Sequence, residues 1–263
     1  MLILTYLMVG ALAGLLAGFF GIGGGIVIVP VLIITFEYLK FSPEVLTHMA
    51  IATSLGAIAF TSISSALTHH LKGAVDWLLV AQLSIGILFG AAVGAITADA
   101  LSGEDLQFAI GIFAFVVAVH MGLGLTPRST RPLLTNKGMV ASGGVIGWAS
   151  ALFGIGGGAI TVPFLIWFNH PMRRSVATAA ACGVPIAIVG AISNIAIGWG
   201  NVDLPENSAG YVYLPALAGI VVTSVPFAKI GANLAHKVPA QILTKLFAIL
   251  LVLVAIKFLT VNL

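Results

Sequence analysis

The chain has 263 residues, of which 60% are hydrophobic and 7% are charged, and its formal net charge is +3. Soluble domains carry about 25% charged residues, so this chain cannot cover a water-facing surface. The composition therefore predicts an integral membrane protein with little or no soluble domain. The single cysteine, Cys182, excludes an internal disulfide framework. The basic residues are scattered between apolar runs, so no nucleic-acid partner is expected.

Ten apolar segments follow one another along the chain, and about 20 helical residues suffice to cross a bilayer. They cover residues 2–20, 26–39, 45–70, 76–98, 105–125, 138–153, 158–169, 174–198, 211–234 and 240–260. Their apolar residues do not alternate with polar ones, as they would in the strands of an outer-membrane barrel. We therefore predict an all-α polytopic membrane protein.

The second half of the chain repeats the first. The hexapeptide F-G-I-G-G-G at 20–25 returns at 153–158, and both copies lie between apolar runs. Self-similarity over nearly the whole length indicates two homologous halves. The predicted organisation is repeat 1 over 1–125, a polar connector over 126–137 and repeat 2 over 138–263.

If the first two segments of each repeat are separate passes, each repeat contains five segments, and because this number is odd the two repeats face opposite sides of the membrane. If they formed one pass, Arg173 and Arg174 would lie on the side opposite the basic residues of the connector. If the connector is cytoplasmic, then Lys72, Arg173 and Arg174 are cytoplasmic too, as the positive-inside rule requires. Both termini are then extracytoplasmic. Inverted repeats are typical of secondary transporters that bind substrate near the membrane midplane. The sequence leaves open whether the first two segments of each repeat span the bilayer or form a re-entrant hairpin.

Each glycine motif precedes an apolar run of about a dozen residues, which is too short to cross a bilayer. Glycine permits positive φ, and the free N–H groups at the start of the following helix can bind an anion. We therefore predict two anion-facing turns, and close helix packing is the alternative. The predicted binding residues of the two turns are Gly21, Gly23, Gly24, Gly25 and Ile26, and Gly154, Gly156, Gly157, Gly158 and Ala159.

Polar side chains inside the apolar runs are further candidates for anion contacts. A polar group in a membrane segment costs free energy, so its presence there indicates a function or a hydrogen-bond partner. They are Thr53, Ser54, Thr178, His69, His70 and Asn194. Thr53 and Thr178 occupy equivalent positions in the two repeats. Hydrogen bonding between helices is the alternative role for the hydroxyls. For the two histidines the alternative is placement at the membrane interface.

A family resemblance follows from the duplicated motif. The stretches "GFFGIGGGIVIVPVL" and "ALFGIGGGAITVPFL", each followed by an Ala-Thr pair and a G-x-V-D turn, resemble the sulfite exporter TauE/SafE family, also called the toluene-sulfonate uptake permease family. The resemblance covers nearly the whole chain. It implies transport of a sulfur-containing anion, such as sulfite, a sulfonate or sulfoacetate, across a prokaryotic cytoplasmic membrane. It settles neither the substrate nor the direction of transport.

We therefore expect a secondary transporter that works by alternating access, since no ATP-binding motif is present. No cofactor or metal is expected. The alternatives are an anion channel and a membrane-embedded sulfur-handling enzyme. The enzyme would need a convergent acid–base or metal constellation, and the sequence has neither H-E-x-x-H nor paired intramembrane carboxylates. Coupling to protons or another ion and assembly into a homodimer stay open.

Overall fold

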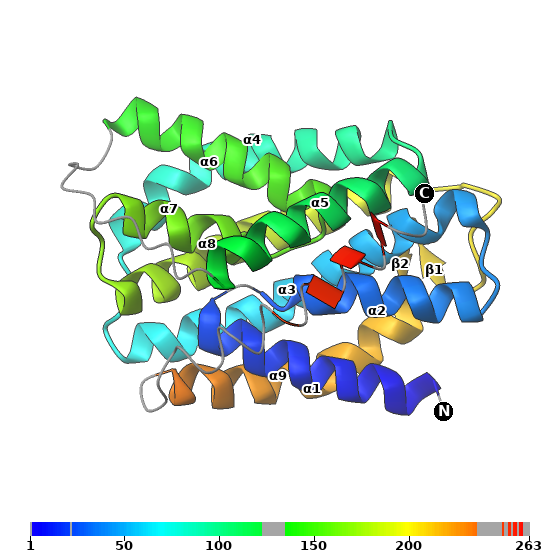
Figure 1. The fold of residues 1–263 in the computed structure, drawn as a ribbon, viewed down its shortest axis with the longest axis horizontal. Helices are drawn as coiled ribbons and strands as arrows, with labels where there is room; N and C mark the ends of the chain where they lie inside the picture. The colour runs from blue at the N-terminus through cyan, green and yellow to red at the C-terminus, as the bar shows by residue number, and fades with distance from the viewer. Residues whose placement is uncertain are drawn as a thin grey trace.

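The computed structural model describes residues 2–21, 23–122 and 135–235, with 249, 252–253, 255–256 and 258–259. These residues form an elongated bundle of helices (Figure 1). In chain order the elements are α1 (Leu2–Phe20), α2 (Gly25–Tyr38), α3 (Pro43–Leu71), α4 (Trp77–Asp99), α5 (Gly103–Gly122), α6 (Asn136–Leu152), α7 (Gly158–Trp167), α8 (Met172–Ile197), β1 (Ser208–Ala209), β2 (Val212–Tyr213) and α9 (Leu214–Leu234).

The predicted all-α polytopic architecture is confirmed, with one local exception. The predicted helix start at residue 211 falls inside a short antiparallel hairpin of β1 and β2, and α9 starts only at Leu214. Gly210 turns this hairpin with a φ of 53°. Its neighbours are aromatic and β-branched, and such residues suit strands as well as helices. The predicted segment at 240–260 lies largely outside the described residues.

Local signals set several helix starts. Pro43 occupies the first turn of α3, where its missing N–H costs no hydrogen bond. Asp76 caps α4, and its side chain accepts a hydrogen bond of 3.2 Å from the Leu79 N–H. Thr135 caps α6 in the same way through the Gly138 N–H. Each of these caps marks the start of the helix that follows a polar connection.

Five of the described helices are long and apolar enough to cross a membrane, namely α1 from Ile3 onward, α3, α4, α8 and α9. The helices α2 and α7 are shorter, with 14 and 10 residues. Large apolar side chains point outward from the bundle, such as Ile3 at 73% and Phe89 at 75% exposure. Hydrocarbon chains solvate such a surface and water does not. The chain is therefore a multi-pass membrane protein.

Two helix pairs at opposite edges of the bundle flank the central α3 and α8 (Figure 1). In one pair, α1 approaches α9 so closely that a Cβ on Gly14 would overlap the Ser224 carbonyl oxygen. In the other, a Cβ on Gly147 of α6 would lie 2.6 Å from the Ile87 carbonyl oxygen of α4. Small residues permit this backbone approach, which is a common way for helices to associate in membranes.

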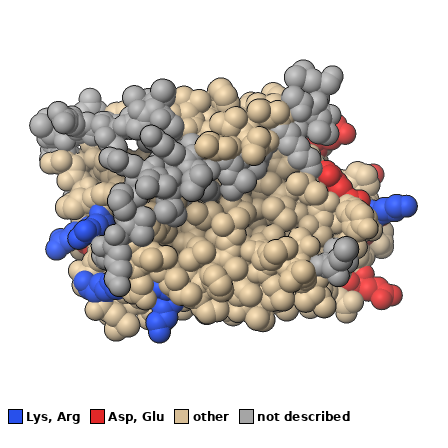
Figure 2. Space-filling view, turned by 60° about the horizontal axis from the view of Figure 1, so that its bottom comes forward, with Lys and Arg blue, Asp and Glu red and all other residues tan. Residues whose placement is uncertain are grey.

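Charged side chains gather at the two ends of the bundle. On the face that Figure 2 shows, Lys and Arg lie at one end and Asp and Glu at the other, apart from one basic group at the acidic end. Between them the surface is uncharged where it is described. The basic end holds the end of α3 and the start of α8, with Lys72, Arg173 and Arg174. This distribution suits a protein whose middle lies in hydrocarbon.

Candidate functional site

The two glycine motifs form turns that start helices in the protein interior. α2 follows Gly24, at φ 79° and ψ −8°, and α7 follows Gly157, at φ 74° and ψ −19°. Glycine adopts this left-handed conformation without the steric cost that other residues incur. Neither helix start has a side-chain cap. The first N–H groups of each helix therefore lack intrahelical partners and form the positive end of its dipole.

The two turns contact each other although they belong to different halves of the sequence. A Cβ on Gly23 would lie 2.7 Å from the Gly156 Cα. A Cβ on Gly25 would overlap the Gly154 carbonyl oxygen and lie 2.8 Å from the Ile155 Cα. The glycines of both turns are buried where described. The backbones of the two glycine turns therefore pack against each other in the interior, directly before the uncapped starts of α2 and α7.

Thr53 and Thr178 each accept a hydrogen bond from the start of a helix in the opposite half of the chain. The Tyr213 N–H, just before α9, donates a hydrogen bond of 2.9 Å to the Thr53 Oγ1. The Asp76 N–H, just before α4, donates one of 3.1 Å to the Thr178 Oγ1. Both threonines are completely buried. These bonds favour the interhelical role that was the alternative to anion binding.

Ser54 and Asn194, two other candidates, lie in different surroundings. The Ser54 hydroxyl donates a hydrogen bond of 2.8 Å to the Gly154 carbonyl and so links α3 to the second glycine turn. The Asn194 amide donates one of 2.8 Å to the Gly190 carbonyl of its own helix. The structure therefore places Ser54 beside the turns and Asn194 near the far end of α8, close to the hairpin.

His69 and His70 end α3 and point to different environments. The Nε2 of His69, a buried residue, lies 3.1 Å from the carbonyl oxygen of Gly18 in the last turns of α1. The exposed His70 accepts a hydrogen bond of 3.1 Å from the Trp77 indole N–H through its Nδ1. His70 thus fits the interfacial alternative, whereas His69 lies inside the protein near the first glycine turn.

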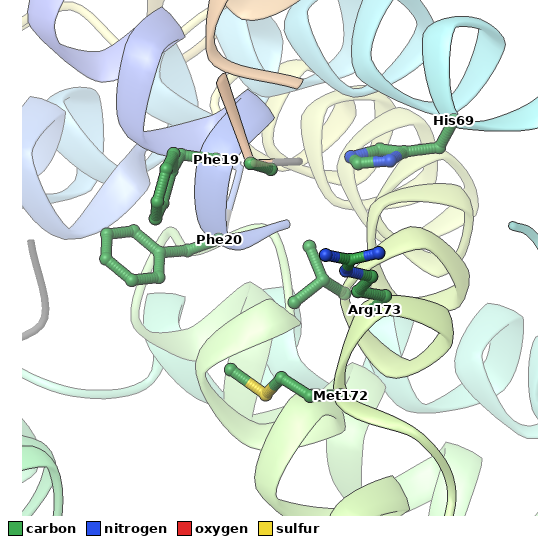
Figure 3. A pocket seen from close by; sticks show the side chains of 7 residues that line it. Phe19, Phe20, His69, Met172 and Arg173 are labelled. Carbon is green, nitrogen blue, oxygen red and sulfur yellow. The ribbon is translucent and has the colours of Figure 1, made fainter. Parts of the chain in front are cut away.

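A pocket opens at the basic end of the bundle beside His69. Its volume is about 400 Å³, open mouth included. Its lining residues are Phe19, Phe20, His69, Met172, Arg173, Val176 and Ala235. Figure 3 shows the His69 ring and the Arg173 guanidinium group near each other in the pocket, with the two phenylalanines at the end of α1 on the other side. The pocket therefore combines an apolar wall with a permanently charged cation.

The pocket borders the first glycine turn. A Cβ on Gly21, whose φ is 69°, would overlap the carbonyl oxygen of Val176, which also lines the pocket. The sequence indicates Arg173 only as a topology signal and does not predict its place in a pocket. Nothing in the spacing of Arg173 and His69 indicates that the ends of α3 and α8 meet there. A guanidinium group at this position can attract and bind an anion.

The comparisons with known proteins identify the family of the chain. The family model described as "Sulfite exporter TauE/SafE" matches residues 6–258. The chain belongs to the TauE/SafE family. No solved structure matches it significantly.

Relatives of this TauE/SafE chain are described as probable membrane transporter proteins. One from Haemophilus influenzae is 40% identical over 258 residues, which cover 97% of each chain. One from Methanocaldococcus jannaschii is 27% identical over 240 residues, covering 88% of this chain and 86% of the relative. YunE of Bacillus subtilis is 28% identical over 270 residues, covering 94% and 93%. The similarity to probable transporters therefore spans both glycine turns and the pocket.

Proposed function

We propose that the chain is a secondary transporter that moves a small sulfur-containing anion, of the sulfite, sulfonate or sulfoacetate class, across a prokaryotic cytoplasmic membrane by alternating access. The observation that carries this proposal is the contact between the two glycine turns, in which Gly23 lies against Gly156 and Gly25 against Gly154, directly before two uncapped helices. Their dipoles bring two positive ends into one region of the interior. Broken helices with N-termini facing an anionic group are a recurrent device of transporters.

The packing of the helices supports the two-repeat organisation on which alternating access depends. By the alignment of the repeats, α1 corresponds to α6 and α9 to α4. The contact of Gly14 with the Ser224 carbonyl then corresponds to that of Gly147 with the Ile87 carbonyl. The two threonine hydrogen bonds to the starts of α9 and α4 correspond in the same way. A pseudo-two-fold relation between the halves would let one half move against the other.

The basic end of the bundle faces the cytoplasm in this proposal, and both chain termini face outward, following the positive-inside rule. The pocket with His69 and Arg173 is then the cytoplasmic access to the glycine turns. The backbone contact between Gly23 and Gly156 fills the space between the two turns. A filled centre favours a carrier that alternates between states over a permanently open pore.

Transport by the purified protein in liposomes tests the proposal. Labelled sulfite, sulfoacetate and toluenesulfonate should enter with saturable kinetics, and at least one should show counterflow. Flux that rises linearly with concentration would instead indicate a channel, and no flux of any of the three would refute an organosulfur or sulfite carrier.

The variant Arg173→Gln should raise the half-saturating concentration about tenfold, because a charged hydrogen-bond donor at the pocket is lost. Arg174→Gln is the matched control, since Arg174 follows in the same turn of α8 and does not line the pocket. Equal effects of the two variants would show that the pocket has no specific part in anion access.

A further inference from the structure

The second glycine turn is flanked by two buried hydroxyl groups that have no hydrogen-bond partner among the described residues. The Ser150 Oγ lies 3.3 Å, and the Thr161 Oγ1 3.6 Å, from the position that a Cβ on Gly157 would occupy. Both residues are completely buried, and neither hydroxyl oxygen is satisfied. Buried polar atoms are rarely left unpaired, so such a pair indicates a site that accepts something.

The local fold brings these hydroxyls to the start of α7. The Ile155 N–H donates a hydrogen bond of 2.9 Å to the Ser150 carbonyl and folds the chain back over the end of α6. Thr161 lies one turn into α7, and its N–H donates one of 2.8 Å to the Gly157 carbonyl. One hydroxyl thus comes from the helix before the turn and the other from the helix after it. The first N–H groups of α7, which a helix leaves without intrahelical partners, directly follow Gly157.

Among the described residues, the first glycine turn has no hydroxyl groups at the equivalent positions. By the repeat alignment, Ala17 and Ile28 stand where Ser150 and Thr161 stand, and both are buried and apolar. A Cβ on Gly24 would lie 2.9 Å from the Ala13 Cβ. The two turns therefore share their backbone conformation at the helix start and differ in polarity. Packing and the helix dipole account for the first turn, and neither accounts for the buried hydroxyls at the second turn.

We propose that the second turn binds the oxyanion group of the transported substrate, a sulfite or sulfonate group, whereas the first turn contributes packing and the dipole of its helix but no side-chain donor. This inference rests on the proposed transport function. The Ser150 and Thr161 hydroxyls and the N–H groups at the start of α7 donate hydrogen bonds to the oxygen atoms of the anion. Hydroxyl and backbone donors carry no full charge, so they bind an anion without making its release slow.

Ile186 covers this site. Its Cδ1 occupies the space beside Gly157, so that a Cβ on Gly157 would overlap it. This methyl group is the end of a flexible side chain on α8, and rotation of the side chain would uncover the hydroxyls. The structure therefore corresponds to a closed form of the site, and substrate access requires a movement of Ile186.

Anion binding to the purified full-length chain in detergent tests this site, with sulfite and toluenesulfonate as probes. Ser150→Ala and Thr161→Val should each weaken binding about tenfold or more, because each removes one donor to a charged group. Thr161→Ser keeps the hydroxyl and should retain the affinity. Thr35→Val is the matched control, because the Thr35 hydroxyl is buried in α2 and bonds to the Val31 carbonyl of its own helix.

The melting temperature without ligand provides a second measurement. Removing an unpartnered buried hydroxyl leaves no group unsatisfied, so Ser150→Ala and Thr161→Val should melt at or above the wild-type temperature. Unchanged affinity in both variants, with wild-type binding intact, would refute this site and leave the transport function standing. A lower melting temperature with unchanged affinity would assign the hydroxyls to a structural water and refute it equally. Failure of the wild type to bind either probe would count against the proposed function itself.

Discussion

The variant Thr53→Val is expected to destabilise the folded protein without weakening anion binding. Valine keeps the shape of threonine and removes the acceptor of the 2.9 Å hydrogen bond from the Tyr213 N–H. Thr53 is completely buried, but Tyr213, whose N–H loses its acceptor, is half-buried, so water can replace the lost acceptor only in part. Leaving a buried donor unsatisfied costs about 1–3 kcal/mol, and the partial access of water places this donor toward the lower end of that range. For a protein of this size that corresponds to a fall of roughly 2–10 °C in melting temperature.

Tryptophan fluorescence during heating of the detergent-purified protein measures this fall, and sulfite binding is measured on the same sample. Thr178→Val should give a similar fall, because it removes the acceptor of the Asp76 N–H at the start of α4. Thr35→Val should have a smaller effect, since its hydroxyl donates to a carbonyl within its own helix. An unchanged melting temperature together with lost sulfite affinity would contradict this reasoning and return Thr53 to the substrate site.

Two further predictions concern packing and orientation. Gly143→Ala should destabilise the protein by more than about 1 kcal/mol, because its Cβ would overlap a facing carbonyl oxygen of α4. Gly144→Ala should be neutral or stabilising, since the one atom near its Cβ lies 3.9 Å away and alanine favours helix. Equal melting temperatures of the two variants would contradict the close approach of α4 and α6. In single-cysteine variants that lack the native thiol, an impermeant maleimide added to intact cells should label Asn207→Cys and not Ser129→Cys, and the reverse result would overturn the proposed orientation.

Local chemistry made much of the fold predictable from the sequence. The composition determined the membrane class, and uninterrupted apolar runs located helices such as α1, whose predicted and observed limits are both 2 and 20. Glycine at 24 and 157 indicated backbone that other residues tolerate poorly, and both adopt the left-handed conformation. The hairpin before α9 was missed, because aromatic and β-branched residues are compatible with either helix or strand.

The candidate site depended on contacts that no local pattern encodes. The sequence places Thr53 inside an apolar run, but only the packed bundle shows that its hydroxyl meets the start of α9. His69 and Arg173 line one pocket because the ends of α3 and α8 come together there. Ser150 and Thr161 look like ordinary small residues in apolar helices until the second turn places both beside Gly157. The role of a buried hydrogen-bonding group depends on its partner. That partner is determined by which helices pack together, and these helices can be far apart in the sequence, so no local pattern predicts the contact.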